Sequence, residues 1–163
     1  MKNLGTHGFL ARVGALAAVV GLIAGVGVVA PSPAMAAARD CAGGANGFVD
    51  IPDNLSGLEV EQVRSGSHWL VLNFGKVNGV TRGWAMLFAS DNGPVQDWLP
   101  KESSVWLDWS QDGGRTWLQC GPFYNSKGKM SITSAAKQTS SSSQWVFRAG
   151  ARDGGVQVLS RWH

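Results

Sequence analysis

The chain has 163 residues, with 14 Lys and Arg against 11 Asp and Glu, two cysteines and eight tryptophans. This length suits one domain and excludes a large multidomain enzyme or a long repeat array. A hydrophobic fraction of 44% with only 15% charged residues excludes a disordered chain, while the formal charge of +3 suggests an acidic partner.

Residues 1–36 have the pattern of a secretory signal peptide. Two basic residues lie near its start, Val13–Ala30 is a run of apolar residues and glycines, and Ala34-Met35-Ala36 is an A-x-A cleavage site. We therefore expect cleavage between Ala36 and Ala37 and a secreted mature chain. An uncleaved membrane anchor is the alternative, which the glycines in the run and the prompt cleavage site disfavour.

Removing the leader changes the charge balance. Lys2 and Arg12 are its only charged residues, so residues 37–163 keep 12 of the 14 basic residues against all 11 acidic ones, a net charge of +1. The suggestion of an acidic partner disappears with the leader, and nucleic-acid binding is disfavoured. We expect one monomeric domain over 37–163 that has no membrane contact after cleavage.

Both cysteines remain in the mature chain. An exported chain with two cysteines most simply forms one disulfide, here Cys41–Cys120. A redox role is disfavoured because the two lie far apart in the sequence without a C-x-x-C context. Only His68 and His163 remain in the mature chain, and neither is near a cysteine, so we expect no metal site and no cofactor.

Strands and turns follow in chain order. Alternating apolar residues predict strands over 58–63, 68–77 and 80–89, and Asn78-Gly79 between the last two is typical of a hairpin turn. Residues 90–103 contain two prolines and are predicted to form a long loop, which we expect Trp98 to anchor.

Two hairpins with the same turn sequence follow. Strands over 105–111 and 115–121 flank Asp112-Gly113-Gly114, and strands over 145–152 and 156–162 flank Asp153-Gly154-Gly155. In each turn we expect the aspartate to accept turn amide hydrogens and the glycines to take positive φ.

The polar segment 125–144 separates these hairpins. We expect a short strand at 130–133, a serine-rich surface loop, and a solvated basic patch made of Lys127, Lys129 and Lys137. No stretch shows sustained helical periodicity. The sequence therefore predicts an all-β fold, an antiparallel sandwich or small barrel of six to eight strands.

The first of these turns lies in a specific motif, Ser-x-Asp-x-Gly-x-Thr-Trp, formed by Ser110, Asp112, Gly114, Thr116 and Trp117. The segment resembles the Asp-box hairpin, which is repeated in sialidase propellers and found singly in other secreted bacterial proteins, including some small microbial ribonucleases. The resemblance covers eight residues and implies a structural hairpin away from any catalytic centre. The rest of the sialidase pattern does not carry over. The chain is too short for a propeller, and it has no counterpart to that family's catalytic arginines and tyrosine.

Two sets of residues offer catalytic alternatives. The ribonucleases need a glutamate, an arginine and a histidine close together, and Glu61, His68 and an arginine could form such a site, although nothing in their spacing selects it. A small secreted hydrolase could use Asp97, Asp108 and Asp153. We expect these three acids to lie in solvent or in turns.

The tryptophans are the remaining functional feature, because exposed indoles can stack on sugar rings. Trp106 and Asp108 alternate with the apolar residues of their strand, so they share a face and are exposed if that apolar set is buried. We expect a non-catalytic secreted β-domain that binds a glycan or cell-wall polymer through Trp84, Trp98, Trp106 and Asp108. The alternatives are an extracellular protein-binding module, such as a hydrolase inhibitor acting through loop 90–103 or 125–144, and the small hydrolase.

Overall fold

The structure is a computed structural model that describes residues 38–89 and 98–163. They belong to one compact unit, Pro31–His163. The predicted signal peptide, its cleavage site and residues 90–97 of the predicted long loop lie outside the described residues. Within the described ranges, no helix is long and apolar enough to cross a membrane.

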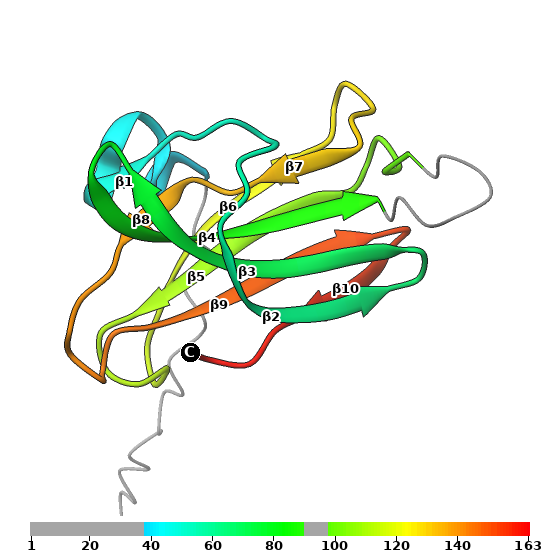
Figure 1. Ribbon diagram of the computed structural model, residues 1–163. Coiled ribbons are helices and arrows are strands. Elements are labelled where there is room, and N and C mark those ends of the chain that lie inside the picture. Colours follow the sequence, from blue (N-terminus) through cyan, green and yellow to red (C-terminus); the bar gives the residue numbers. More distant parts are fainter. Residues whose placement is uncertain (1–37, 90–97) are drawn as a thin grey trace, which may run out of the picture. The chain divides into compact units, whose positions relative to one another are not determined.

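The described residues form two antiparallel sheets, with hairpins inside each sheet and longer connections between the two (Figure 1). The larger sheet has the order β1-β8-β4-β3-β2, and β7 also pairs with β4. Its strands are β1 (Phe48–Val49), β2 (Leu58–Ser65), β3 (His68–Val77), β4 (Val80–Ala89), β7 (Ser131–Thr133) and β8 (Ala136–Gln138).

The smaller sheet has the order β10-β9-β5-β6. Its strands are β5 (Ser104–Ser110), β6 (Leu118–Tyr124), β9 (Val146–Asp153) and β10 (Val156–Leu159). Two short 3₁₀ segments, η1 (Ala38–Asp40) and η2 (Ala42–Gly47), precede the first strand.

The all-β prediction is confirmed, in the form of a sandwich. The bounds of β3 and β4 agree with the prediction, and the turn between them has positive φ at Asn78 (52°) and Gly79 (80°), as an Asn-Gly hairpin requires. The described residues contain ten strands rather than six to eight, because two of the three short strands, β1, β7 and β8, were not predicted. Of these short strands, β7 was predicted.

The core lies between the two sheets. Side chains alternate across each strand, so one set from β3 and β4 faces one set from β5 and β9. The cluster includes Leu70, Leu72, Leu87, Val105, Leu107, Phe147 and Ala149, all of them buried. Phe74 of β3 and Phe147 of β9 meet edge to face across the layer, with ring centroids 5.6 Å apart.

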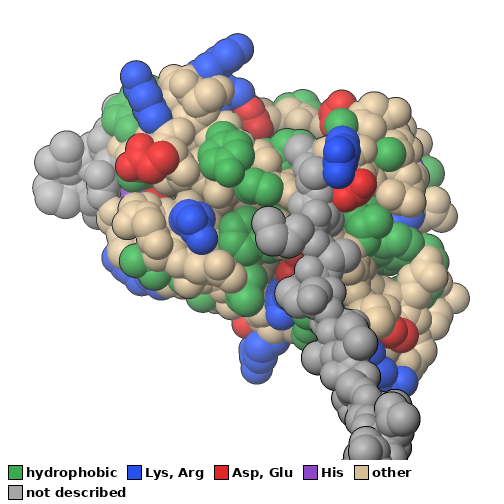
Figure 2. Space-filling view, turned by 180° about the vertical axis from the view of Figure 1, so that it is seen from behind, with side chains coloured by type: hydrophobic (Ala, Val, Ile, Leu, Met, Phe, Trp, Pro, Cys, Tyr) green, Lys and Arg blue, Asp and Glu red, His purple; other side chains and the backbone are tan. Residues whose placement is uncertain are grey.

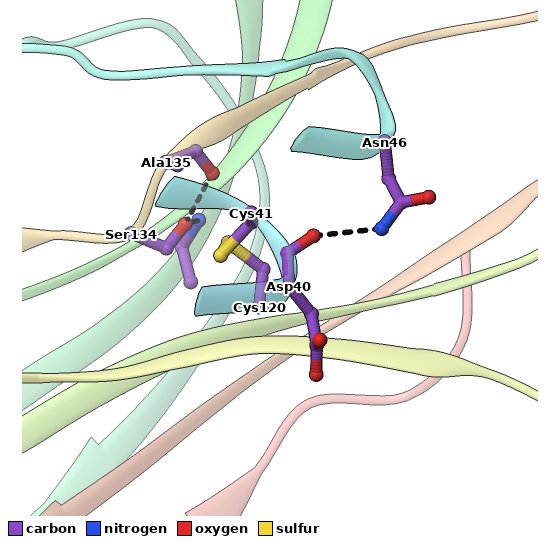
Figure 3. Close-up of a disulfide and its surroundings, with 7 residues drawn as sticks. Asp40, Cys41, Asn46, Cys120, Ser134 and Ala135 are labelled. Atoms are coloured by element: carbon purple, nitrogen blue, oxygen red, sulfur yellow. Dashed lines mark hydrogen bonds between the residues drawn. A yellow bond between two sulfur atoms is a disulfide. The ribbon is translucent and has the colours of Figure 1, made fainter. Parts of the chain in front are cut away.

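The predicted disulfide Cys41–Cys120 is present (Figure 3). The Cα atoms of its two residues are 5.5 Å apart, and neither residue has exposed surface. The bond ties the segment before β1 to the middle of β6. Beside it, the Asn46 amide donates a hydrogen bond of 2.7 Å to the Asp40 carbonyl (Figure 3). The start of the described chain is therefore fixed to the smaller sheet by a covalent bond.

The prediction of a solvated basic patch is wrong for Lys137, which lies on β8 and is buried. Its Nζ atom lies 4.1 Å from the ring centroid of Trp109 and 5.5 Å from that of Trp145. The same amine donates a 2.6 Å hydrogen bond to the carbonyl of Asn46. Burial, with a smaller effect of the Arg82 charge, lowers the pKa of Lys137. The indole faces and the carbonyl compensate for lost hydration, so this lysine holds η2 against β8.

Candidate functional site

All eight tryptophans lie in the described ranges, and Trp98 alone among them is exposed, at 54%. The expectation that Trp98 anchors the long loop is therefore wrong. The neighbouring Leu99 is buried instead, and the side-chain amide of Asn125 donates to its carbonyl over 2.9 Å. The buried Leu99 side chain and the Asn125 amide bonded to the Leu99 carbonyl fix this end of the loop, and the Trp98 indole does not.

Trp84 is also wrongly predicted as an exposed residue, since its exposed fraction is 1%. Its indole Nε1 donates to the carbonyl of Leu55 over 3.1 Å, and its ring covers Gly57 and Gly75. A Cβ atom on either glycine would come within 2.9 Å of the ring, so the two glycines make room for it. Trp84 belongs to the larger sheet and does not share a face with Trp106.

Trp106 lies on the outer face of the smaller sheet, as the alternation along β5 predicts, but only 7% of its surface is exposed. Its indole ring lies directly against Gly150 of β9, where an added Cβ atom would be 2.1 Å from Cε2 of the ring. Gly121 of β6 makes room on the other side, where a Cβ atom would be 2.8 Å from Cβ of Trp106. The expectation of a freely exposed indole is wrong because both neighbouring strands carry glycine beside it.

Asp108 shares this outer face and is 1% exposed, so the expectation of a solvated carboxylate is wrong. Arg148, opposite it on β9, donates to Oδ2 from Nε over 2.9 Å and from Nη2 over 2.7 Å. The guanidinium carbon of Arg148 lies 4.5 Å from the ring centroid of Trp162 and 5.1 Å from that of Trp117. Burial raises the pKa of Asp108, against the opposing effects of Arg148 and of the Trp106 side chain. Asp108 therefore organises the face and is not available to a ligand.

Beside these residues the outer face of the smaller sheet contains a cavity of about 540 Å³, which we call the outer hollow. Tyr124, at the end of β6, is 63% exposed and is its most accessible aromatic residue. Trp106 contributes to the lining. The other residues of the lining are Glu102, Ser104, Gln119, Pro122, Arg152, Gly155 and Gln157.

Sequence reasoning selected Trp106 and missed the other members of the outer hollow. The strand pairing brings them together: Ser104 pairs with Arg152 on one side and with Tyr124 on the other, and Arg152 pairs with Gln157. The period-two alternation places these residues on one face, but only the register of three strand pairs shows that they are neighbours. Tyr124, the one tyrosine of the chain, was the available signal in the sequence.

The hairpin of the Ser-x-Asp-x-Gly-x-Thr-Trp segment is held by its own side chains. Ser110 Oγ donates to Asp112 Oδ1 over 2.7 Å and accepts the Gly114 amide over 2.9 Å. Asp112 accepts the Thr116 amide on Oδ1 over 2.9 Å and the Thr116 hydroxyl on Oδ2 over 2.7 Å. These bonds, those from Thr116 first, lower the pKa of Asp112 to about 2. Trp117 packs on Trp162, with ring centroids 6.0 Å apart. This hairpin borders the outer face and does not line the outer hollow.

The second Asp-Gly-Gly turn differs, and the expectation that Asp153 accepts turn amides or lies in solvent is wrong. Gly154 and Gly155 do have positive φ, but the Asp153 carboxylate is buried and binds His68, whose Nδ1 lies 2.6 Å from Oδ2. Asp153 and Asp108 lie on opposite faces of the smaller sheet, and Asp97 lies outside the described residues. The acids of the hydrolase alternative are therefore not assembled among the described residues.

Glu61 does not join His68 either. Its Oε2 atom lies 2.6 Å from Nε2 of His163, and Oε1 accepts a 3.1 Å hydrogen bond from Nε of Arg161. Burial raises the pKa of Glu61, but the hydrogen bonds of His163 and Arg161 together outweigh it and lower that pKa below its ordinary value. The cluster joins β2 to the end of the chain at the edge of the two sheets.

The chain matches no protein-family model, no curated protein and no solved structure. Among the described residues, no group of three or more His, Cys, Asp or Glu side chains could hold a metal ion.

Proposed function

We propose that the protein is a secreted carbohydrate-binding module and that a glycan binds in the outer hollow. The volume of about 540 Å³ lies in the range of small-ligand sites. The hollow combines an exposed tyrosine ring with the amides of Gln119 and Gln157 and the charges of Glu102 and Arg152. A sugar ring presents apolar C–H faces and a rim of hydroxyl groups, so an aromatic surface surrounded by polar side chains suits both parts.

The observation that carries this proposal is the position of Tyr124. Its ring is accessible and stands beside Trp106, whose indole is fixed by the glycines of two neighbouring strands. A rigid aromatic residue loses little conformational entropy when it binds a ligand. On the coloured part of the face that Figure 2 shows, hydrophobic side chains lie among basic and acidic ones. Such a face favours an amphipathic ligand over a large apolar protein interface.

An extracellular location agrees with the disulfide. Such bonds persist in oxidising compartments and are rare in the cytosol. The proposed signal peptide, residues 1–36, would deliver the chain to such a compartment. A glycan of the cell wall or of the surroundings would then be the available ligand.

The test measures retention of the mature protein on insoluble polysaccharides: cellulose, chitin and purified cell walls. We expect the wild type to be retained on at least one of them and Tyr124→Ala to weaken that binding about tenfold, as expected when a stacking aromatic is removed. Trp98→Ala is the matched control, because Trp98 is the other strongly exposed aromatic residue of the described chain and does not line the outer hollow. Retention that survives Tyr124→Ala and is lost in Trp98→Ala would place the ligand elsewhere, and a protein that stays in the supernatant with all three polymers would refute the proposal.

A further inference from the structure

A second cavity, of about 300 Å³, adjoins the outer hollow at Tyr124, the only described residue that lines both. We call it the side cavity. One part of its wall is the segment between β1 and β2, and the other parts are the end of β6 and the chain from β7 to the start of β8. Its lining residues are Asp50, Ile51, Asp53, Phe123, Tyr124 and residues 132–135.

The wall that residues 50–53 form is fixed to β7. Asp53 Oδ1 accepts the Thr133 amide over 3.2 Å, and the Thr133 hydroxyl donates to the carbonyl of Pro52 over 3.3 Å. The other carboxylate oxygen of Asp53 forms an ion pair with the amine of Lys129. These contacts hold the side cavity in shape before a ligand arrives. A preformed wall loses little conformational entropy when a ligand binds to it.

Asp50 supplies the free polar side chain of the side cavity. The residue is exposed, and no hydrogen bond or ion pair joins its carboxylate to another described residue. The carboxylate of Asp53 and the hydroxyl groups of Thr133 and Ser134 already bond within the protein. A carboxylate accepts hydrogen bonds on both oxygens, so Asp50 suits a ligand that presents hydroxyl groups. Because Lys129 balances the charge of Asp53, the charge of Asp50 remains and would repel an anionic ligand.

Tyr124 stands where the two cavities meet. Its ring is 63% exposed, and Ser104, its partner across the β5–β6 pair, lines the outer hollow. Each cavity volume, about 540 and about 300 Å³, lies in the range of a small-ligand site by itself. A single sugar unit beside the ring would therefore leave one cavity empty, whereas linked units on both sides of the ring would fill both.

We propose that the side cavity continues the glycan site of the outer hollow and that the ligand is an uncharged linear oligosaccharide of at least two sugar units. One unit lies in the outer hollow, and a neighbouring unit lies in the side cavity, where its hydroxyl groups donate to Asp50. Tyr124 contacts the ligand between them. This inference rests on the proposed function and assigns the class of glycan: a segment of a neutral polymer, such as cellulose or chitin, rather than a single sugar or an anionic chain.

The test titrates the mature protein with two series of probes, the cello-oligosaccharides and the N-acetylated chito-oligosaccharides. Each series runs from the monosaccharide to the hexasaccharide, and isothermal titration calorimetry gives the affinity for each member. In at least one series we expect the affinity to rise about tenfold or more from the shortest to the longest member, because only the longer members reach the side cavity.

Two exposed acids provide the variants. Asp50→Ala removes the free acceptor of the side cavity and leaves the lining of the outer hollow intact. It should lower the affinity for the hexasaccharide about tenfold, as expected when hydrogen bonds to a charged group are lost, and leave the shortest bound member unchanged. Glu59→Ala is the matched control, because Glu59 is exposed and lines neither cavity. It should bind every member like the wild type.

The outcomes separate this inference from the proposed function. An affinity independent of length, or wild-type affinity of Asp50→Ala for the hexasaccharide, would overturn the side cavity as a glycan site and leave the outer hollow as one. An equal loss in Glu59→Ala would also overturn it, because the effect would then come from overall charge. Retention on cell walls without binding to either series would reject the neutral chain and keep the proposed function. A protein that binds neither series and none of the three polymers would refute both.

Discussion

Removal of the disulfide should destabilise the protein by an amount that follows from the chain length it closes. Cys41 and Cys120 are 79 residues apart in the sequence. In the chain-entropy model, a loop of this length corresponds to about 4.5 kcal/mol at 25 °C. In Cys41→Ala/Cys120→Ala, two buried sulfur atoms are also lost from the core, which adds about 1 kcal/mol. The total of about 5–6 kcal/mol is comparable with the whole stability of many domains, about 5–15 kcal/mol.

The assay is urea unfolding of the mature protein and the double variant, followed by tryptophan fluorescence. We expect a lower midpoint and a steeper dependence on urea, because the uncrosslinked unfolded chain exposes more surface. Far-UV circular dichroism without urea controls for the variant's fold. A loss of less than about 1 kcal/mol with an unchanged slope would refute the reasoning, because that result would mean the disulfide does not restrict the unfolded chain.

Three further substitutions test single contacts. The pKa of Asp112 is lowered from 3.8 to about 2 in the folded protein, so its contribution to the free energy of unfolding is present above pH 3.8 and is lost as the pH falls towards 2. The urea midpoints of Asp112→Asn and the wild type should therefore differ at neutral pH and converge near pH 2. Equal midpoints at every pH would contradict this view. Gly150→Ala places a Cβ atom 2.1 Å from Cε2 of Trp106. Such overpacking costs about 1–3 kcal/mol, so the midpoint of thermal unfolding should fall. An unchanged midpoint would mean that the Trp106 ring is not confined by Gly150. The lowered pKa of Lys137 means that the unfolded state binds more protons, so the free energy of unfolding of the wild type should rise as the pH approaches the ordinary lysine pKa of 10.5. Urea unfolding of Lys137→Met at neutral to alkaline pH should lack this rise. The same dependence of stability on pH in both proteins would contradict the lowered pKa.

The parts of the fold that the sequence predicts are those whose signals are local. The β3–β4 hairpin depends on alternation within ten residues on each side of Asn78-Gly79, and both strands end where predicted. The disulfide follows from a count of two cysteines in a chain that the sequence predicts to be exported. In each case, the information needed lies within one short segment or in the composition, so no knowledge of tertiary neighbours is required.

The two Asp-Gly-Gly turns show where local information ends. Asp112 has Ser110 two positions before it and Thr116 four positions after it, and these residues supply its hydrogen bonds. Asp153 has no such neighbours and binds His68, which lies 85 positions away, and Ser103, which lies 50 positions away. The same tripeptide thus places one carboxylate in its own turn and the other in a buried cluster. The flanking serine and threonine mark the first turn in the sequence, whereas the partners of Asp153 are supplied by the arrangement of the sheets.

The candidate site was only partly predictable for the same reason. Alternation along β5 correctly placed Trp106 and Asp108 on one face. Their burial depends on Gly150 and Arg148, which reach them through the pairing of β5 with β9. The exposure of an outward-facing side chain is decided by its cross-strand neighbours, and the register that selects those neighbours is not encoded within either strand alone.

The β9–β10 hairpin lies between the outer hollow and a third cavity of about 480 Å³. Successive side chains of a strand point to opposite faces, so residues adjacent in the sequence can serve different cavities. The outer hollow is lined by Arg152, Gly155 and Gln157, and the third cavity by Asp153, Gly154, Val156 and Val158. Arg152 therefore lines the outer hollow, whereas the Asp153 carboxylate is held by three buried hydrogen-bonding partners. Because the wall is a single hairpin, loss of the Asp153 cluster would loosen Arg152 and Gln157 as well, which makes the buried carboxylate a support for the face that we propose binds the glycan.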